Sequence, residues 1–183
     1  MKLVLWALVS FFVLFSAGKA QDEDPFAEKT PERLKFYKEK YDTVYAKPFE
    51  IVWKGVLKSL EDENCQTIKK SYKQTDDGVY KGSIHSDYCL LTQNKDSAKT
   101  VLDKFSYAMP IIRGGTWTTA RFQYKFIVAE QKDGTVSLEI RGEISGREDY
   151  VTTQVHFWKS NGILETEMMK KVSANIDALS RTE

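Results

Sequence analysis

The sequence AKPFEIVWKGVLKSLEDENC, residues 46–65, decides the fold that we predict for the rest of the chain. Its apolar side chains recur at steps of three and four residues, which is the spacing of one face of an α-helix. Pro48 suits the first turn of such a helix, and Asn64 suits its end. The helix must bury its apolar face against a second layer. That face consists of Phe49, Val52, Trp53, Val56, Leu57 and Leu60.

Two β-hairpins of the same design follow the helix. The first spans residues 65–91 and the second spans residues 116–144, and their turns end in Gly78 and Gly134. In the second hairpin the apolar residues share one face only if opposed residue numbers have an even sum, because a slip of one residue turns a strand over. A three-residue loop that ends in a left-handed glycine meets this condition. The predicted pairs are Val128 with Leu138, Phe126 with Ile140, and Phe122 with Ile144, with Gly142 opposite Tyr124.

The same loop in the first hairpin places the two cysteines of the chain, Cys65 and Cys89, opposite each other. In an oxidising compartment such a pair forms a disulfide, which is our prediction. Two alternatives stay open, namely a pair of buried thiols and a zinc site. In the zinc site His85, Asp87 and Cys89 share one face of a strand and Cys65 faces them. Strand alternation produces such triplets by chance, so we predict no metal and no cofactor.

The remaining elements complete an α+β fold. A strand is predicted at residues 41–47, another at residues 150–158, and a C-terminal helix after Gly162 whose apolar stripe includes Leu164, Met168, Val172, Ile176 and Leu179. We predict an antiparallel sheet of about five strands with the long helix and the C-terminal helix packed on one face. The predicted order is β-α-β-β-β-β-β-α, in a single domain of residues 41–183 with an insertion at residues 93–115.

The first 20 residues have the pattern of a secretory signal. Lys2 precedes an apolar run at residues 3–15, and small residues follow up to Ala20, after which we expect cleavage. Residues 21–40 are predicted to be an N-terminal arm with a short helix that starts at Thr30-Pro31. The remaining 163 residues contain no second apolar run of spanning length. We therefore predict a periplasmic or secreted protein without a membrane span in its mature chain.

Composition narrows the class of partner. Without Lys2 and Lys19, 25 basic residues face 26 acidic ones, and no basic run is long enough to follow a phosphate backbone. Nucleic acid is therefore disfavoured. The 42% hydrophobic and 13% aromatic content indicates a folded domain.

The insertion at residues 93–115 is the predicted binding site. It contains a short helix to about Phe105 and then the apolar segment YAMPII at residues 107–112. Long structured connections often carry binding functions. Two nearby tryptophans have the strand parity opposite to the main apolar face, which predicts that they line a pocket or partner surface. The residues predicted to bind an apolar ligand or a protein partner are Tyr107, Met109, Ile112, Arg113, Trp117 and Trp158.

Catalytic motifs are missing around the two histidines, His85 and His156. The sequence has no nucleophile elbow, no cysteine protease signature and no H-E-x-x-H. We therefore predict a non-enzymatic binding or interaction module. The alternative is a small periplasmic hydrolase that uses His85 or His156 with a nearby acid.

The run Pro48-Phe49-x-x-Val52-Trp53-x-x-Val56-x-x-x-Leu60, followed by the segment GVYKG at residues 78–82, resembles the opening of helix-grip domains in small bacterial envelope proteins, including BamC-like ones. The resemblance covers roughly residues 41–84, and the C-terminal helix fits it. It implies a helix-grip-like fold and an envelope location, and it transfers no catalytic residue. The predicted partner is an apolar ligand or an envelope protein. The chain departs from BamC-like lipoproteins in its insertion and in having no lipoprotein cysteine directly after the apolar run at residues 3–15.

Overall fold

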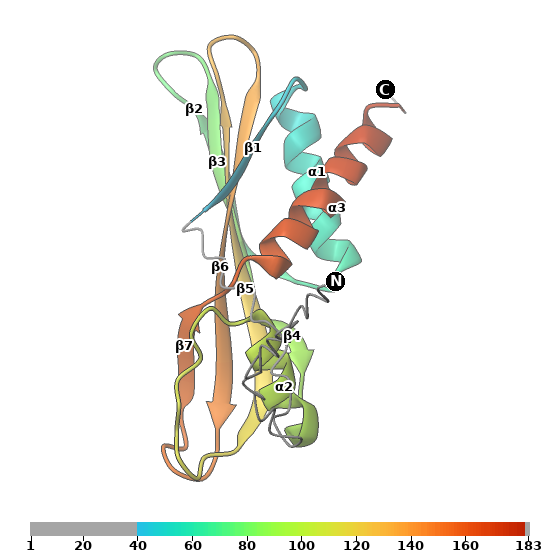
Figure 1. Cartoon of the computed structure of the whole chain (residues 1–183). Helices are drawn as coiled ribbons and strands as arrows, with labels where there is room; N and C mark the ends of the chain where they lie inside the picture. The colour runs from blue at the N-terminus through green and yellow to red at the C-terminus, as the bar shows by residue number, and fades with distance from the viewer. Residues whose placement is uncertain (1–39, 182–183) are drawn as a thin grey trace, which may run out of the picture. The chain divides into compact units, whose positions relative to one another are not determined.

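The computed structural model describes residues 40–181, so the predicted signal segment and nearly all of the predicted arm lie outside the described residues. The described residues belong to one compact unit. None of its helices is long and apolar enough to cross a membrane. The elements in chain order are β1 (Tyr41–Tyr45), α1 (Phe49–Asp62), β2 (Thr67–Gln74), β3 (Tyr80–Ser86), β4 (Cys89–Thr92), α2 (Lys95–Phe105), β5 (Trp117–Glu130), β6 (Val136–Glu148), β7 (Val155–Lys159) and α3 (Ile163–Leu179) (Figure 1).

The strands form one antiparallel sheet of seven strands. The order across the sheet is β1-β6-β5-β3-β2, with β4 added beside β5 and β7 added beside β6. The α+β class and the antiparallel sheet are confirmed, whereas the predicted count of about five strands falls short. One reason is that the returning strand of the first hairpin breaks at Asp87 and Tyr88, which separates β3 from β4.

All three helices pack on the same face of this sheet. In Figure 1, α1 and α3 lie together near the hairpin turns, and α2 covers the opposite end. Two glycines of β6 mark these contacts, since a Cβ atom on Gly142 would meet Glu165 of α3, and one on Gly146 would meet Leu102 of α2. Gly142 and Gly146 share one strand parity, so both helices lie on one side. We call the other side, which none of the described helices covers, the outer face.

The register of the second hairpin is confirmed. Gly134 has a left-handed φ of 79°, and the loop is closed by a hydrogen bond from the Gln131 N–H to the Thr135 carbonyl. Because this loop fixes an even sum, the large apolar side chains of both strands meet on the helix-covered face. The observed pairs include Val128 with Leu138, Phe126 with Ile140, Phe122 with Ile144 and Tyr124 with Gly142.

The first hairpin follows the predicted register for most of its length. Gln74 lies opposite Tyr80 and Lys69 lies opposite His85, but the register shifts between Thr67 and Lys69. The strand break then moves Cys89 into β4, where it pairs with β5. The predicted disulfide is confirmed, with Cα atoms of Cys65 and Cys89 5.0 Å apart. The predicted ladder position of Cys65 is wrong, because one irregularity changes the opposition of every later residue.

Helix α1 has the predicted apolar face. Its stripe from Phe49 to Leu60 is buried, apart from the partly exposed Leu57. Asn64 ends the helix with a left-handed φ of 54°, and the Cys65 N–H donates to the Leu60 carbonyl at 2.8 Å. This arrangement satisfies a carbonyl of the last turn and directs the chain into β2. Helix α3 likewise buries most of its predicted stripe, including Leu164, Met168, Val172 and Ile176.

Candidate functional site

The structure divides the six predicted binding residues into a packed group and an exposed group. Trp117 is only 5% exposed, and its ring centroid lies 5.4 Å from that of Trp158. The Trp158 indole N–H donates to the Ser106 hydroxyl at 2.6 Å. Met109 and Ile112 are partly buried against the core, whereas Tyr107 and Arg113 are exposed.

The predicted face of both tryptophans is wrong. A β-bulge at Thr118 adds one residue between the pairs Trp117–Glu148 and Thr119–Arg147, which returns Trp117 to the helix-covered face. Trp158 lies opposite Ile144, a core residue, and therefore shares that face. The exposed apolar residues of strand β7 are instead Val155 and Phe157. A binding role for the residues of the insertion stays a prediction.

The carboxylate of Glu148, at the end of β6, organises the two loops beside this packed group. Glu148 is fully buried and accepts hydrogen bonds from four backbone N–H groups. The donors are Thr116 at 3.2 Å, Tyr150 at 2.6 Å, Val151 at 2.9 Å and Thr152 at 2.6 Å. The Thr152 hydroxyl adds a fifth bond at 2.7 Å. One carboxylate therefore ties residues 107–116 to residues 149–154, and we call these two loops the loop end.

These hydrogen bonds decide the charge of Glu148. Burial acts to raise the pKa of its carboxyl, but the hydrogen bonds from Thr152, Val151 and Tyr150 outweigh burial and hold the pKa well below its usual value. The group is therefore ionised at neutral pH. Its charge faces N–H dipoles in place of water, which makes the two loops a single ordered unit.

Close packing adds to this order. The Asp149 N–H donates to the Thr116 carbonyl at 3.1 Å. A Cβ atom on Gly115 would lie 2.9 Å from side-chain atoms of both Glu148 and Ile112, so the backbone passes where only glycine fits. A Cβ atom on Gly114 would lie 3.9 Å from a side-chain atom of Val151. The two loops are thus in direct contact.

The loop end displays apolar side chains to solvent. Ile111 is 91% exposed, Tyr150 69%, Val151 56% and Tyr107 44%. Exposed apolar side chains grouped on one surface are a feature of interaction sites. Sequence reasoning missed Tyr150 and Val151 because it assigned them to a strand. It also missed Glu148. The even number of this residue places it on the same strand face as the buried residues of β6, and this was the signal that could have shown its carboxylate to be buried.

The alternative function, a hydrolase, requires a catalytic histidine. The Thr152 hydroxyl lies 2.7 Å from the His156 Nε2 atom, and it donates its proton to Glu148. A nucleophile, a base and an acid need the histidine between the hydroxyl and the carboxylate, whereas here the hydroxyl stands in the middle. His85 lies on the outer face between Lys69 and Lys125. Burial makes the largest contribution to lowering the pKa of His85, and the positive charges of Lys125 and Lys69 lower it further.

The zinc alternative is not supported by the arrangement of its ligands. Both sulfur atoms are held in the disulfide, so neither is a thiolate. His85 lies on the outer face, and Cys89 lies opposite the core residue Phe122 on the helix-covered face. Within residues 40–181, no group of three or more His, Cys, Asp or Glu side chains is placed to hold a metal ion.

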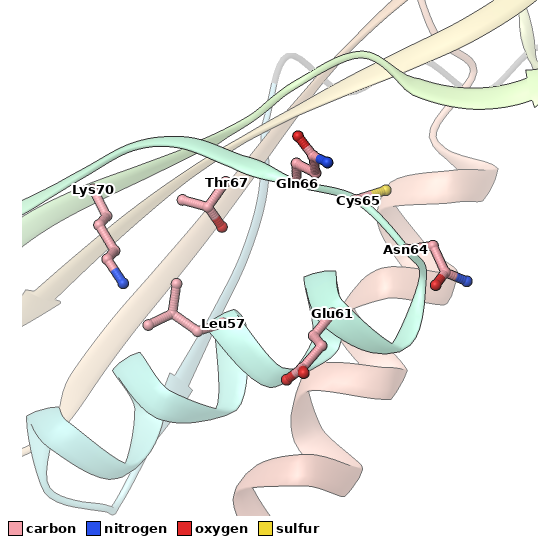
Figure 2. Close-up of a pocket in the computed structure, with 7 residues that line it drawn as sticks. All are labelled: Leu57, Glu61, Asn64, Cys65, Gln66, Thr67 and Lys70. Atoms are coloured by element: carbon pink, nitrogen blue, oxygen red, sulfur yellow. The ribbon is translucent and has the colours of Figure 1, made fainter.

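Two grooves lie away from the loop end. The larger, of about 520 Å³, runs between α1 and β2 (Figure 2). The smaller, of about 250 Å³, lies at the start of α1 among aromatic rings that include Phe49, Tyr72 and Tyr80. Of the predicted binding residues and the two cysteines, only Cys65 lines either groove. The larger groove is lined by Leu57, Glu61, Asn64, Cys65, Gln66, Thr67 and Lys70.

Comparison with known proteins gives no assignment. No protein-family model matches the chain, and no curated protein matches it. The function must therefore be argued from the described surfaces.

Replacing Glu148 with glutamine tests the role of its carboxylate in the loop end. The amide group turns one acceptor into a donor that faces backbone N–H groups, so we expect the melting temperature to fall by roughly 5–10 °C. The amides of residues 150–152 should exchange with solvent at least tenfold faster in hydrogen-exchange measurements. The exposed Glu143 on the same strand provides the control, Glu143→Gln.

The loss of stability caused by Glu148→Gln depends on pH. Because the folded pKa of Glu148 is depressed, its stabilising effect is complete above the unfolded value of about 4.3 and is lost as the pH falls through the folded pKa. The difference between wild type and Glu148→Gln should therefore stay constant from pH 5 to pH 8 and shrink at lower pH. Equal melting temperatures of the two proteins at pH 7 would contradict this role.

Proposed function

We propose that the protein is a non-enzymatic interaction module, and that the loop end binds an apolar surface of a protein partner. The observation that carries the proposal is the fixed exposure of Ile111, Tyr150 and Val151 on loops held by a buried carboxylate. A flexible loop would hide such side chains or lose entropy on binding. A loop that is already ordered loses less, so more of the contact energy appears as affinity.

Polar residues adjoin these apolar residues in both loops. Arg113 is exposed beside Ile111 and Ile112, and the Arg147 guanidinium donates to the Asp149 carboxylate at 2.6 Å. An apolar centre with a polar rim is the usual composition of a protein interface. Neither groove described above is part of the loop end. We therefore favour a protein surface over a small apolar ligand as the bound species.

The proposed location is the periplasm or the exterior of the cell. The signal pattern of residues 1–20 and the disulfide both support an oxidising compartment. The resemblance of residues 41–84 to helix-grip domains supports an envelope protein as the partner. A helix-grip-like arrangement is part of this proposal, because it places two helices against one face of an antiparallel sheet.

Site-specific photo-crosslinking in the source cell tests the proposal. A photoreactive residue is placed at Ile111, at Val151 and, as a control, at the exposed hairpin residue Lys132. We expect the same partner to be captured from positions 111 and 151 and not from position 132. With that partner purified, Ile111→Asp should weaken binding at least tenfold, because a carboxylate cannot be buried in an apolar contact without a partner.

The design also defines the opposite result. Capture from position 132 with the same efficiency would show that the adducts are unspecific. No adduct at positions 111 and 151, or an unchanged affinity of Ile111→Asp, would reject the loop end as the interface.

A further inference from the structure

Strand β2 ends the main path of the sheet. Among the strands of residues 40–181 it pairs with β3 alone, which leaves its other edge unpaired within this part of the chain, and each of residues 68–74 is exposed. The N–H and C=O groups that point away from β3 are therefore available to a further strand. Such an edge is the place where an extended peptide adds to a sheet in many recognition domains.

The larger groove lies directly beside this edge. Figure 2 shows Thr67 and Lys70 on β2 with their side chains directed toward Leu57 on α1. Glu61 stands on the α1 wall of the same groove. A cleft between a helix and an edge strand holds an extended chain well, because the strand supplies backbone hydrogen bonds and the helix wall supplies side-chain contacts.

The lysines of β2 give this edge a strong positive charge. Lys69 and Lys73 lie on the outer face, opposite His85 and Lys81, whereas Lys70 lies opposite Ile84 on the groove side. Among the ion pairs and hydrogen bonds of residues 40–181, none involves the side chain of Lys69, Lys70 or Lys73. Like charges opposite each other destabilise a sheet. An anionic partner removes this repulsion.

We propose that the β2 edge and its groove bind an extended acidic segment of a partner protein. The segment adds to the sheet as an eighth strand, with carboxylates beside Lys69 and Lys73 on the outer face. Its alternate side chains enter the groove and contact Leu57. Those positions are apolar, because the Leu57 side chain projects into the groove and the Glu61 carboxylate on its wall offsets the charge of Lys70. This site is independent of the loop end and does not rest on its proposed function.

Charge also decides between this partner and a second copy of the chain. Pairing of β2 with β2 would set the lysines of one copy against those of the other, which costs energy at each opposed position. An edge strand rich in lysine is protected against this self-pairing. The same lysines attract a strand of opposite charge.

A designed peptide tests the proposal. The eight-residue peptide acetyl-(Glu-Val)4-amide presents glutamates on one face of a strand and valines on the other, as the site requires. We expect isothermal titration calorimetry to show binding that weakens as salt is added. The charge-reversed peptide acetyl-(Lys-Val)4-amide should not bind. Binding should also perturb the backbone amide signals of residues 67–74 in NMR spectra, since the contact is made through the strand edge.

Matched variants assign the binding to β2. Lys69→Glu/Lys73→Glu should lower the affinity for the glutamate peptide at least tenfold, and Lys69→Gln/Lys73→Gln should lower it by a smaller factor. Lys95→Glu/Lys170→Glu makes the same change of charge on α2 and α3, at exposed residues away from β2, and should leave the affinity unchanged. Ile111→Asp should also leave it unchanged, which separates this site from the loop end.

Three results would overturn the proposal. The first is no binding of the glutamate peptide at low salt. The second is equal weakening by the β2 variant and the Lys95/Lys170 control, which would indicate general charge attraction only. The third is a dimer in light scattering that the Lys69/Lys73 variant disrupts, because a second copy would then occupy the edge.

Discussion

Replacing Cys65 and Cys89 with serine is expected to lower the free energy of unfolding by about 3–4 kcal/mol. The disulfide joins residues that are 24 positions apart, and a closed loop of that length removes much of the freedom of the unfolded chain. The bond also fastens the end of α1 to β4. Both cysteines are buried, and the Cys89 Sγ atom lies near the Ser86 hydroxyl and the Asp87 carbonyl, so a serine hydroxyl at this position has polar neighbours and the loss is mainly that of the bond.

Urea denaturation of the double variant and of wild type measures this loss. Wild type in the presence of a reductant should unfold at the same urea concentration as the double variant, because both then lack the bond. The single variant Ser137→Ala, at a partly exposed position of β6, is the control for handling and buffer effects. An unfolding midpoint of the double variant equal to that of oxidised wild type would reject the predicted stabilisation.

Replacing Gly142 with alanine is the second change of large expected effect. The added Cβ atom would overlap the Phe122 ring and would lie 2.5 Å from a carboxylate oxygen of Glu165. Both neighbours are buried, and Glu165 is held by the Ser160 hydroxyl, so neither moves away freely. Overpacking of a core costs about 1–3 kcal/mol and sometimes more, and we expect a loss of about 3 kcal/mol.

The measurement is again urea denaturation, with Glu143→Ala as the control on the same strand. Glu143 is exposed, so its truncation should change the free energy of unfolding by less than about 0.5 kcal/mol. Near-ultraviolet circular dichroism adds a second readout, because the Phe122 and Tyr124 rings, 4.6 Å apart, must shift to admit the methyl group. If Gly142→Ala has the same free energy of unfolding as Glu143→Ala, the predicted cost of overpacking at Gly142 is wrong.

The parts of the fold that repeat locally could be predicted from the sequence. The apolar stripe of α1 has a period that fits only a helix, and the Asp-Gly turns fix the register of the strands that they join. The pairing of Val128 with Leu138 follows from the shared parity of the apolar residues together with a three-residue loop that ends in Gly134. In these segments each local preference agrees with the final structure.

The strand irregularities could not be predicted. The bulge at Thr118 has no glycine or proline to mark it, yet it moves Trp117 from one face to the other. The shift between Thr67 and Lys69 is equally unmarked, and it displaces Cys65 from the ladder. A β-strand has a side-chain period of two, so a single extra residue reverses every assignment beyond it.

The loop end could be predicted in part. The insertion was an expected site because of its length and its apolar segment, but nothing local distinguishes Glu148 from a surface acid. Its carboxylate acquires its role from backbone N–H groups of Thr116 and of residues 150–152, which only the folded chain brings together. Tyr150 and Val151 are exposed for the same reason, since the chain curls around the carboxylate in place of continuing as a strand.

The long strands β5 and β6 have a consequence for how this protein can diverge. One end of these strands is packed under α1 and α3, and the other end under α2, so the two ends share strands but are covered by different helices (Figure 1). Substitutions that reshape the loop end therefore leave the packing of α1 and α3 intact. Natural selection, or an engineer, can therefore change the exposed residues of the segment 107–113, such as Tyr107, Ile111 and Arg113, and keep the opposite end as an unchanged scaffold.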